Sequence, residues 1–141
     1  MPKIVIFYSR TGNTKKVAEE YAGKNGIDIY EIKDKVNRKG FFGFIKSAIQ
    51  ALVRKSTPIG EITADLSNYS RVILCTPIWV STIPSPVRTF IMKYGQFINK
   101  VEYIVLYKNK NEEYGKVFDE MDTIMRKKRI RSLAIETNEK K

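Results

Sequence analysis

The sequence predicts an α/β protein built on a doubly wound, five-stranded parallel sheet. Short apolar runs alternate five times with segments of helical periodicity, a pattern typical of parallel strands joined by crossover helices. A hydroxyl-rich turn leads directly from the first apolar run into the first helical segment. The length of 141 residues suits one hydrophobic core. We therefore expect residues 1–141 to form a single domain.

The beginning of the chain predicts two strands with a helix between them. Residues 3–8 form an apolar run, as expected of a buried strand. A helix is expected over residues 13–24, with Gly26 ending it. Residues 27–32 alternate apolar and polar side chains, which indicates a less buried strand at the edge of the sheet.

A second helix is predicted over residues 41–53, where apolar residues at 41, 44, 45, 48, 49 and 52 share one helical face. We expect this face to cover one side of the sheet, because a doubly wound sheet needs helices on both sides. The alternative is an element that lies on a membrane surface, given its basic flanks. Phe42 lies outside the apolar face and is a candidate for a ligand site or a contact surface.

The second half of the chain predicts three more strands and two helices. Residues 71–75 are apolar enough for a central strand, and residues 102–107 and 130–136 are the next two. Between them, a helix is expected with Ser85 as its cap, Pro86 in its first position and Gly95 at its end. The last helix is marked by an apolar face formed by Tyr114, Val117, Phe118, Met121, Ile124 and Met125.

Composition excludes several classes of function. The chain has no histidine, which excludes histidine zinc ligands and histidine acid–base chemistry. Cys75 is the only cysteine, so no disulfide can form within the chain, which favours a reducing, cytoplasmic setting. We expect no membrane span and no signal peptide, because no apolar run is long enough. The net charge is +11, but no nucleic-acid-binding signature accompanies it, so we expect no nucleic-acid partner.

The turn at residues 9–14 is the first candidate site. The N–H groups of the first helical turn have no internal partner, and the helix macrodipole adds positive charge there. Hydroxyl side chains and one glycine surround that helix start, as expected of a phosphate site. The other interpretation is an ordinary turn with Thr11 or Asn13 as the N-cap. The residues of this turn are Ser9, Arg10, Thr11, Gly12, Asn13 and Thr14.

A strand order of 2-1-3-4-5 would bring three loops together at the carboxyl edge of the sheet, where open α/β sheets bind ligands. These loops are residues 9–14, 76–84 and 108–113. The second contains Trp79 between prolines, which suits contact with a flat aromatic ligand. Together the loops predict a cofactor that carries both a phosphate and an aromatic ring.

The segments at residues 9–14 and 76–90 resemble those of the flavodoxins and flavodoxin-like FMN proteins. This resemblance covers nearly the whole chain and implies a flavodoxin-like fold with non-covalently bound FMN. It implies that residues 9–14 hold the phosphate and that the next loop flanks the isoalloxazine ring. The ring contacts would be Pro77, Ile78, Trp79 and Val80, with Ser81 and Thr82 as polar contacts. The third loop departs from the family in being basic and lacking a glycine; its candidate cofactor contacts are Lys108 and Asn109.

The end of the sequence also departs from the family, because only residues 137–141 follow the last predicted strand, so the final helix is expected to be missing. One face of the sheet would then be bare over its last strands. The small and polar set of Ile130, Ser132, Ala134 and Glu136 fits such a poorly covered side. We expect a homodimer that buries this face.

The expected function is that of an FMN redox protein. It would transfer electrons as a carrier or as a small reductase of quinone-like acceptors, with flavin supplying the chemistry. The basic surface favours an acidic redox partner. The alternative is a flavin-free interaction module that binds an acidic partner. A receiver domain is excluded because the first strand ends in Tyr8, Ser9 and Arg10 instead of acidic residues. A small phosphatase is excluded because Ser81, not arginine, stands six residues after Cys75.

Overall fold

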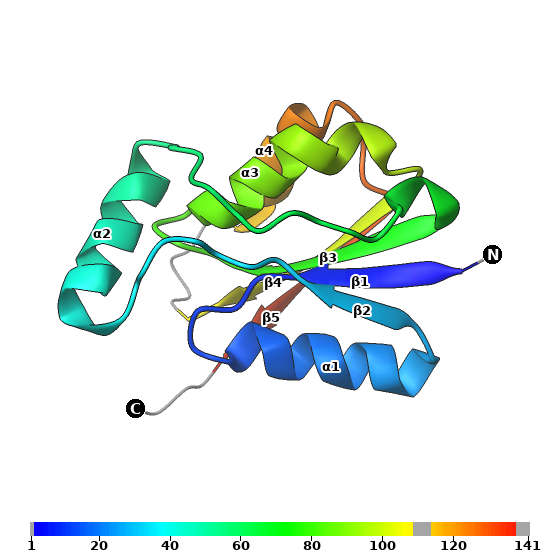
Figure 1. Ribbon diagram of the computed structural model, residues 1–141, viewed down its shortest axis with the longest axis horizontal. Coiled ribbons are helices and arrows are strands. Elements are labelled where there is room, and N and C mark those ends of the chain that lie inside the picture. Colours follow the sequence, from blue (N-terminus) through cyan, green and yellow to red (C-terminus); the bar gives the residue numbers. More distant parts are fainter. Residues whose placement is uncertain (1, 109–113, 138–141) are drawn as a thin grey trace.

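The computed structural model of the protein describes residues 2–108 and 114–137, which form a parallel five-stranded sheet between helical layers (Figure 1). The strand order is β2-β1-β3-β4-β5, as predicted. The strands are β1 (Lys3–Phe7), β2 (Asp28–Glu31), β3 (Arg71–Pro77), β4 (Val101–Tyr107) and β5 (Arg131–Glu136). The main helices are α1 (Asn13–Asn25), α2 (Gly40–Leu52), α3 (Ser85–Tyr94) and α4 (Tyr114–Met125).

β3 is the central strand, because its side chains are covered on both faces. Ile73 and Cys75 belong to the apolar cluster on the α1 side, Val72 and Leu74 belong to the cluster on the opposite side, and all four side chains are buried. The continuous apolar run of β3 is therefore explained by burial on both sides. β2 at the sheet edge has exposed and half-buried residues, which confirms its prediction as an edge strand.

α1 covers one face of the sheet through small side chains. Ala18 and Ala22 pack with Val5, Phe7 and other strand residues in one apolar cluster. Gly26 ends the helix with a φ of 61° and its N–H bonded to the Ala22 carbonyl, as predicted. Because alanines allow a close approach of helix and strand, α1 is held firmly beneath the β1 end that leads into the turn.

The opposite face is covered by α3, α4 and an extended segment, residues 59–66. Ile59, Ile62 and Leu66 of that segment pack over β1 and β3 in the larger apolar cluster. In Figure 1 the segment runs across the sheet from α2 towards β3. It occupies the part of the face that the sequence assigned to α2.

The prediction that the apolar face of α2 covers the sheet is therefore wrong. α2 lies beyond the carboxyl edge of the sheet, beside the layers (Figure 1). Phe41 is 72% exposed and Leu52 is 57% exposed. The buried residues of the helix are instead Gly43, Ser47 and Ala51. The helix is inverted with respect to the usual rule, with its small side chains inside and its large apolar side chains outside.

Two predictions at element ends need correction. Ser85 is not the cap of α3, because the helix already begins at Ser85 and Pro84 occupies the N-cap position. Pro86 is therefore the second residue of the helix instead of the predicted first residue. In β5, the two alternating sets of side chains also face the opposite sides of the sheet from those predicted. Ala134 packs against the cluster on the α4 side, whereas Leu133 lies on the α1 side and is 51% exposed.

The uncovered area at β5 is smaller than the sequence suggested. Ile104 and Leu106 of β4 lie on the same face as Leu133, yet both are buried. The described residues end at Thr137, directly after β5, so the predicted absence of a final helix stays a prediction. The homodimer through this face stays a prediction. None of the helices in the described part of the chain combines the length and apolar character that crossing a bilayer requires.

Candidate functional site

A pocket of about 240 Å³ opens at the carboxyl edge of the sheet. The strands β1, β3 and β4 end at this edge, and α2 lies beyond it (Figure 1). The topology explains the position of the pocket, because the order changes direction between β1 and β3. Ten of its lining residues belong to the predicted site: Ser9, Arg10, Thr11, Asn13, Thr14, Pro77, Ile78, Trp79, Val80 and Lys108.

The turn after β1 is built around Gly12. Its φ of 106° lies in the left-handed region, which glycine adopts without strain. The Gly12 N–H donates to Ser9 Oγ at 2.9 Å, closing the turn. Gly12 is the N-cap of α1 and no side chain caps the helix, so the interpretation of Thr11 or Asn13 as N-cap is wrong. Both side chains instead line the pocket.

The start of α1 offers donors to a ligand. The first helical bond in the turn runs from the Lys16 N–H to the Gly12 carbonyl at 3.0 Å. The N–H groups of Asn13, Thr14 and Lys15 precede it and have no acceptor within the helix. Thr14 is buried and lines the pocket in the same helical turn. Oriented N–H groups, hydroxyls and the helix dipole fit a phosphate group.

The charged residues among the described lining of the pocket are all basic. Arg10 and Lys108 line it, and none of the described lining residues is a carboxylate. Because two cations adjoin the positive end of α1, the pocket favours an anionic ligand.

The opposite wall is a tight turn after β3. Trp79 and Thr82 exchange backbone hydrogen bonds of 2.9 and 3.0 Å, so Val80 and Ser81 form the turn between them. Their φ angles are 52° and 57°, a conformation that is costly for a branched residue such as Val80. The reciprocal bonds hold the strained turn in place and present Ile78, Trp79 and Val80 to the pocket.

The Trp79 ring is half-buried and fixed by two neighbours. Tyr8 meets it edge-on at 5.6 Å between ring centroids, and the Arg38 guanidinium carbon lies 5.5 Å from the ring centroid. The Tyr8 hydroxyl donates to Asp34 Oδ2 at 3.0 Å. Burial, followed by the Asp34 charge, raises the pKa of Tyr8 well above its usual value, so Tyr8 remains a neutral donor.

α2 forms a third wall, and sequence reasoning missed it. Phe44, Ser47 and Ala48 line the pocket. The Arg10 guanidinium joins this helix to the phosphate-type turn, because its Nη2 donates to the Arg38 carbonyl at 2.9 Å and its carbon lies 5.7 Å from the Phe44 ring centroid. The only sequence signal was the excess of aromatic residues at the start of the helix.

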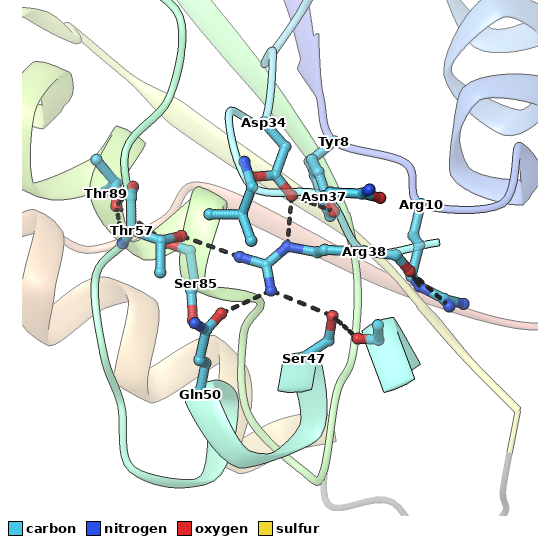
Figure 2. A network of polar contacts seen from close by, with 12 residues as sticks. Tyr8, Arg10, Asp34, Asn37, Arg38, Ser47, Gln50, Thr57, Ser85 and Thr89 are labelled. Atoms are coloured by element: carbon cyan, nitrogen blue, oxygen red, sulfur yellow. Dashed lines mark hydrogen bonds and ion pairs between the residues drawn. The ribbon is translucent and has the colours of Figure 1, made fainter. Parts of the chain in front are cut away.

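Arg38 is the centre of the polar network that holds α2 (Figure 2). Its Nε donates to Asp34 Oδ2 at 2.5 Å, and Nη2 donates to the Thr57 hydroxyl at 3.1 Å. Nη1 donates to Ser47 Oγ at 3.1 Å and to Gln50 Oε1 at 2.6 Å, and both of these residues belong to α2. Arg38 is 4% exposed, so its charge is compensated almost entirely by these partners.

Three of the predicted site residues that the structure describes, Gly12, Ser81 and Thr82, do not line the pocket. Gly12 and Ser81 belong to its bordering turns, and Asn109 lies outside the described residues. Thr82 is buried, and its hydroxyl donates to Glu120 Oε1 at 2.5 Å. Burial raises the pKa of Glu120, but hydrogen bonds from Arg88 and Thr82 and the charges of Arg88 and Arg54 outweigh it, so the net pKa is lowered.

Two further lining residues come from the ends of the last strands. Leu106 lies near the end of β4, and Thr137 follows β5 with its N–H bonded to the Tyr107 carbonyl at 2.8 Å. Their sequence positions carry no motif. Only the parallel packing of the strands brings them to the same edge as the turn after β1.

The fold and the pocket define a class: a doubly wound α/β protein with a pocket at the carboxyl edge of its sheet, between the start of α1 and the turn after β3. Comparison with known families is more specific, because the family model described as flavodoxin matches residues 2–109. The chain therefore belongs to the flavodoxin family. A search of curated proteins found no match.

Solved structures show the same fold. A flavoprotein of Lactobacillus acidophilus NCFM, in complex with FMN, has a TM-score of 0.80 at 19% identity over 94% of this chain and 92% of that chain. A flavoprotein of Bacteroides uniformis has a TM-score of 0.79 at 16% identity over 98% of this chain and 92% of that chain. A flavodoxin from the domain Archaea has a TM-score of 0.61 at 15% identity, over 97% of this chain and 84% of that chain.

Proposed function

We propose that the pocket binds FMN without a covalent link and that the protein transfers electrons. The observation that carries the proposal is the meeting of two unlike walls in one pocket. The start of α1 fits a phosphate, and the Ile78–Trp79–Val80 wall fits a flat aromatic ring. The structural relative solved with FMN supports this assignment.

The roles of the residues follow from the pocket geometry. Ser9, Thr11, Asn13 and Thr14 would hold the phosphate with their hydroxyl, amide and backbone donors. Trp79 would contact the ring from the β3 side. Phe44 and Ala48 lie on α2 and would limit the access of water. Arg10 would hold the turn at residues 9–14 against the α2 wall, because its guanidinium donates to the carbonyls of Arg38 and Gly40 at the beginning of α2.

Bound FMN would supply one- or two-electron chemistry. The protein would tune it through its charges. Arg10 and Lys108 favour the gain of negative charge in the pocket, which raises the reduction potential of a bound cofactor. An acidic protein partner or a small acceptor such as a quinone would suit the basic surface of the chain, whose net charge is +11.

Titration with FMN tests the proposal directly. We expect the protein to bind one FMN per chain, and binding should quench the flavin fluorescence. Riboflavin, which lacks the phosphate, should bind more weakly. A folded protein that binds no FMN would overturn the proposal and favour the flavin-free interaction module. Steady-state turnover of NAD(P)H with a quinone distinguishes a reductase from a carrier, because a carrier alone gives no turnover without a second enzyme.

A further inference from the structure

α2 exposes an apolar surface that the described residues, 2–108 and 114–137, leave open. We call it the α2 apolar face: Phe41, Phe42, Ile45, Ile49, Leu52 and Val53. Phe42 is 84% exposed and Val53 is 64% exposed. Single exposed apolar residues need no explanation, but a group of five on one helix, together with its C-cap residue Val53, marks an interaction surface.

The orientation of α2 is fixed by its opposite face. A Cβ placed on Gly43 would lie 2.2 Å from the carbonyl carbon of Arg38, so only glycine permits this approach. Ser47 and Gln50 bind the Arg38 guanidinium on the same side of the helix (Figure 2). Turning the apolar face inwards would break these bonds and place Phe41 or Ile49 against a buried charge. The exposed face is therefore a stable part of the fold.

The charges around α2 are basic. Residues 35–60 contain six lysines and arginines and no aspartate or glutamate. Arg38 is buried against Asp34, and Arg54 pairs with Glu120. Lys39, Lys46 and Lys55 are exposed, at the start, in the middle and just beyond the end of the helix. Lys46 borders the apolar face, where its aliphatic stem can lie along apolar surface with the ammonium in water.

We propose that the α2 apolar face docks on an anionic lipid bilayer, with the helix lying in the interface and the exposed lysines at the headgroups. Aromatic and aliphatic side chains on one face with lysines at the border are the chemistry of interfacial helices. A bilayer covers the whole face at once without a shaped groove, and α2 projects from the body of the protein (Figure 1). A second copy would instead bring Lys39, Lys46 and Lys55 against lysines of the same kind.

Docking would also orient the pocket, because Phe44 and Ala48 of α2 line it. The pocket mouth would then lie near the lipid surface. Electron acceptors dissolved in the bilayer would then have a short path to the pocket. Only this consequence, and not the docking itself, rests on the proposed FMN function.

Vesicle sedimentation of the full chain, with and without FMN, tests the docking independently of cofactor binding. The vesicles contain phosphatidylglycerol with phosphatidylcholine, or phosphatidylcholine alone. We expect binding to the anionic vesicles at least about tenfold tighter, because each cation near an anionic surface contributes roughly fivefold. Failure to bind FMN with intact vesicle binding would affect only the proposed function.

Paired variants locate the contact. Phe42→Ser with Ile49→Ser should weaken vesicle binding at least about tenfold, because apolar burial drives interfacial insertion. Met92→Ser with Phe97→Ser removes two exposed apolar side chains away from α2 and should leave binding unchanged. Lys39→Glu with Lys46→Glu should weaken it more than Lys100→Glu with Lys128→Glu. Circular dichroism and thermal unfolding check that each variant folds.

A fluorescent label reports insertion. Cys75 is buried, so a cysteine introduced by Phe42→Cys is the accessible thiol for an environment-sensitive dye. We expect a blue shift with anionic vesicles. No binding by the folded wild-type protein, equal binding by the α2 and control variants, or equal binding to neutral vesicles would overturn the proposal. The wild-type protein could instead sediment as a dimer and the variant with Phe42→Ser and Ile49→Ser as a monomer. That result would identify a second copy of the chain as the occupant of the α2 apolar face.

Discussion

The Arg38 main chain runs against Gly43 so closely that a Cβ on Gly43 would lie 2.2 Å from the Arg38 carbonyl oxygen. This approach brings the first turns of α2 onto the Arg38 loop, while the guanidinium of the same arginine binds Ser47 and Gln50 further along the helix. One residue thus fixes α2 through both its backbone and its side chain. The third wall of the pocket depends on this contact.

Gly43→Ala is expected to destabilise the protein and weaken ligand binding, because the helix must move away from Arg38. We expect a loss of about 2 to 3 kcal/mol in the free energy of unfolding, as for overpacking. Denaturant unfolding measures it. Gly23→Ala in α1 is the control: nothing lies within 4 Å of its added Cβ, so helix propensity should stabilise the protein by up to about 1 kcal/mol. Equal effects would contradict the close contact.

Arg38→Ala is expected to cost about 3 kcal/mol of stability, because it leaves Asp34 and the polar groups of α2 without their buried cation. FMN affinity should fall as well, since the Trp79 ring and α2 both lose a contact. Arg54→Ala is the matched control, because its bridge to Glu120 lies at the surface and should cost less than about 1 kcal/mol. Retained stability in Arg38→Ala would show that the network does not hold α2.

Thr11→Glu is expected to weaken FMN binding about 10- to 100-fold, because a carboxylate in the turn repels the phosphate and replaces a hydroxyl donor. Riboflavin binding should change much less, since riboflavin has no phosphate. Thr11 is exposed, so the fold should persist. Thr123→Glu on the exposed side of α4 controls for added charge. Fluorescence titration measures the affinities of the wild type and both variants for FMN and for riboflavin. An equal loss for the two ligands in Thr11→Glu would place the phosphate elsewhere.

Trp79 is expected to report binding directly, because it is the only tryptophan and lines the pocket. FMN should quench its emission in proportion to occupancy. Trp79→Phe should remove the signal and retain a weaker binding that calorimetry detects, since a smaller ring contacts less of the ligand. Unquenched emission at saturating FMN would contradict a ring site beside Trp79.

Glu120 is expected to make stability depend on acid pH. Its pKa is lower in the folded protein than the ordinary value of 4.5, so its contribution is complete above pH 4.5 and is lost as pH falls through the folded pKa. At neutral pH, the free energy of unfolding of Glu120→Gln should therefore be about 1 to 2 kcal/mol lower than that of the wild type.

The difference between Glu120→Gln and the wild type should shrink towards pH 3, because Glu120 becomes protonated in the folded state. Asp119→Asn, at a side chain that is 77% exposed, should behave like the wild type at both pH values. Denaturant unfolding at pH 7 and pH 3 makes the comparison, and a constant difference would contradict the lowered pKa.

The sequence by itself determined the sheet and the two main walls of the pocket. The strands β1, β3 and β4 and the helices α1, α3 and α4 carry apolar patterns that match how they are buried. The turn at residues 9–14 and the Trp79 loop follow strands directly, so the strand order alone brings them together. Local pattern and topology agree at these places, and the predicted strand order is confirmed.

Only the tertiary structure decided the position of α2. Its apolar periodicity is as regular as that of a buried helix, but residues 59–66 already cover the sheet face and Arg38 binds its polar side. Periodicity identifies which residues share a face and carries no information about what that face meets. Leu106 and Thr137 were missed for a related reason, because they reach the pocket through strand packing, which depends on contacts distant in sequence.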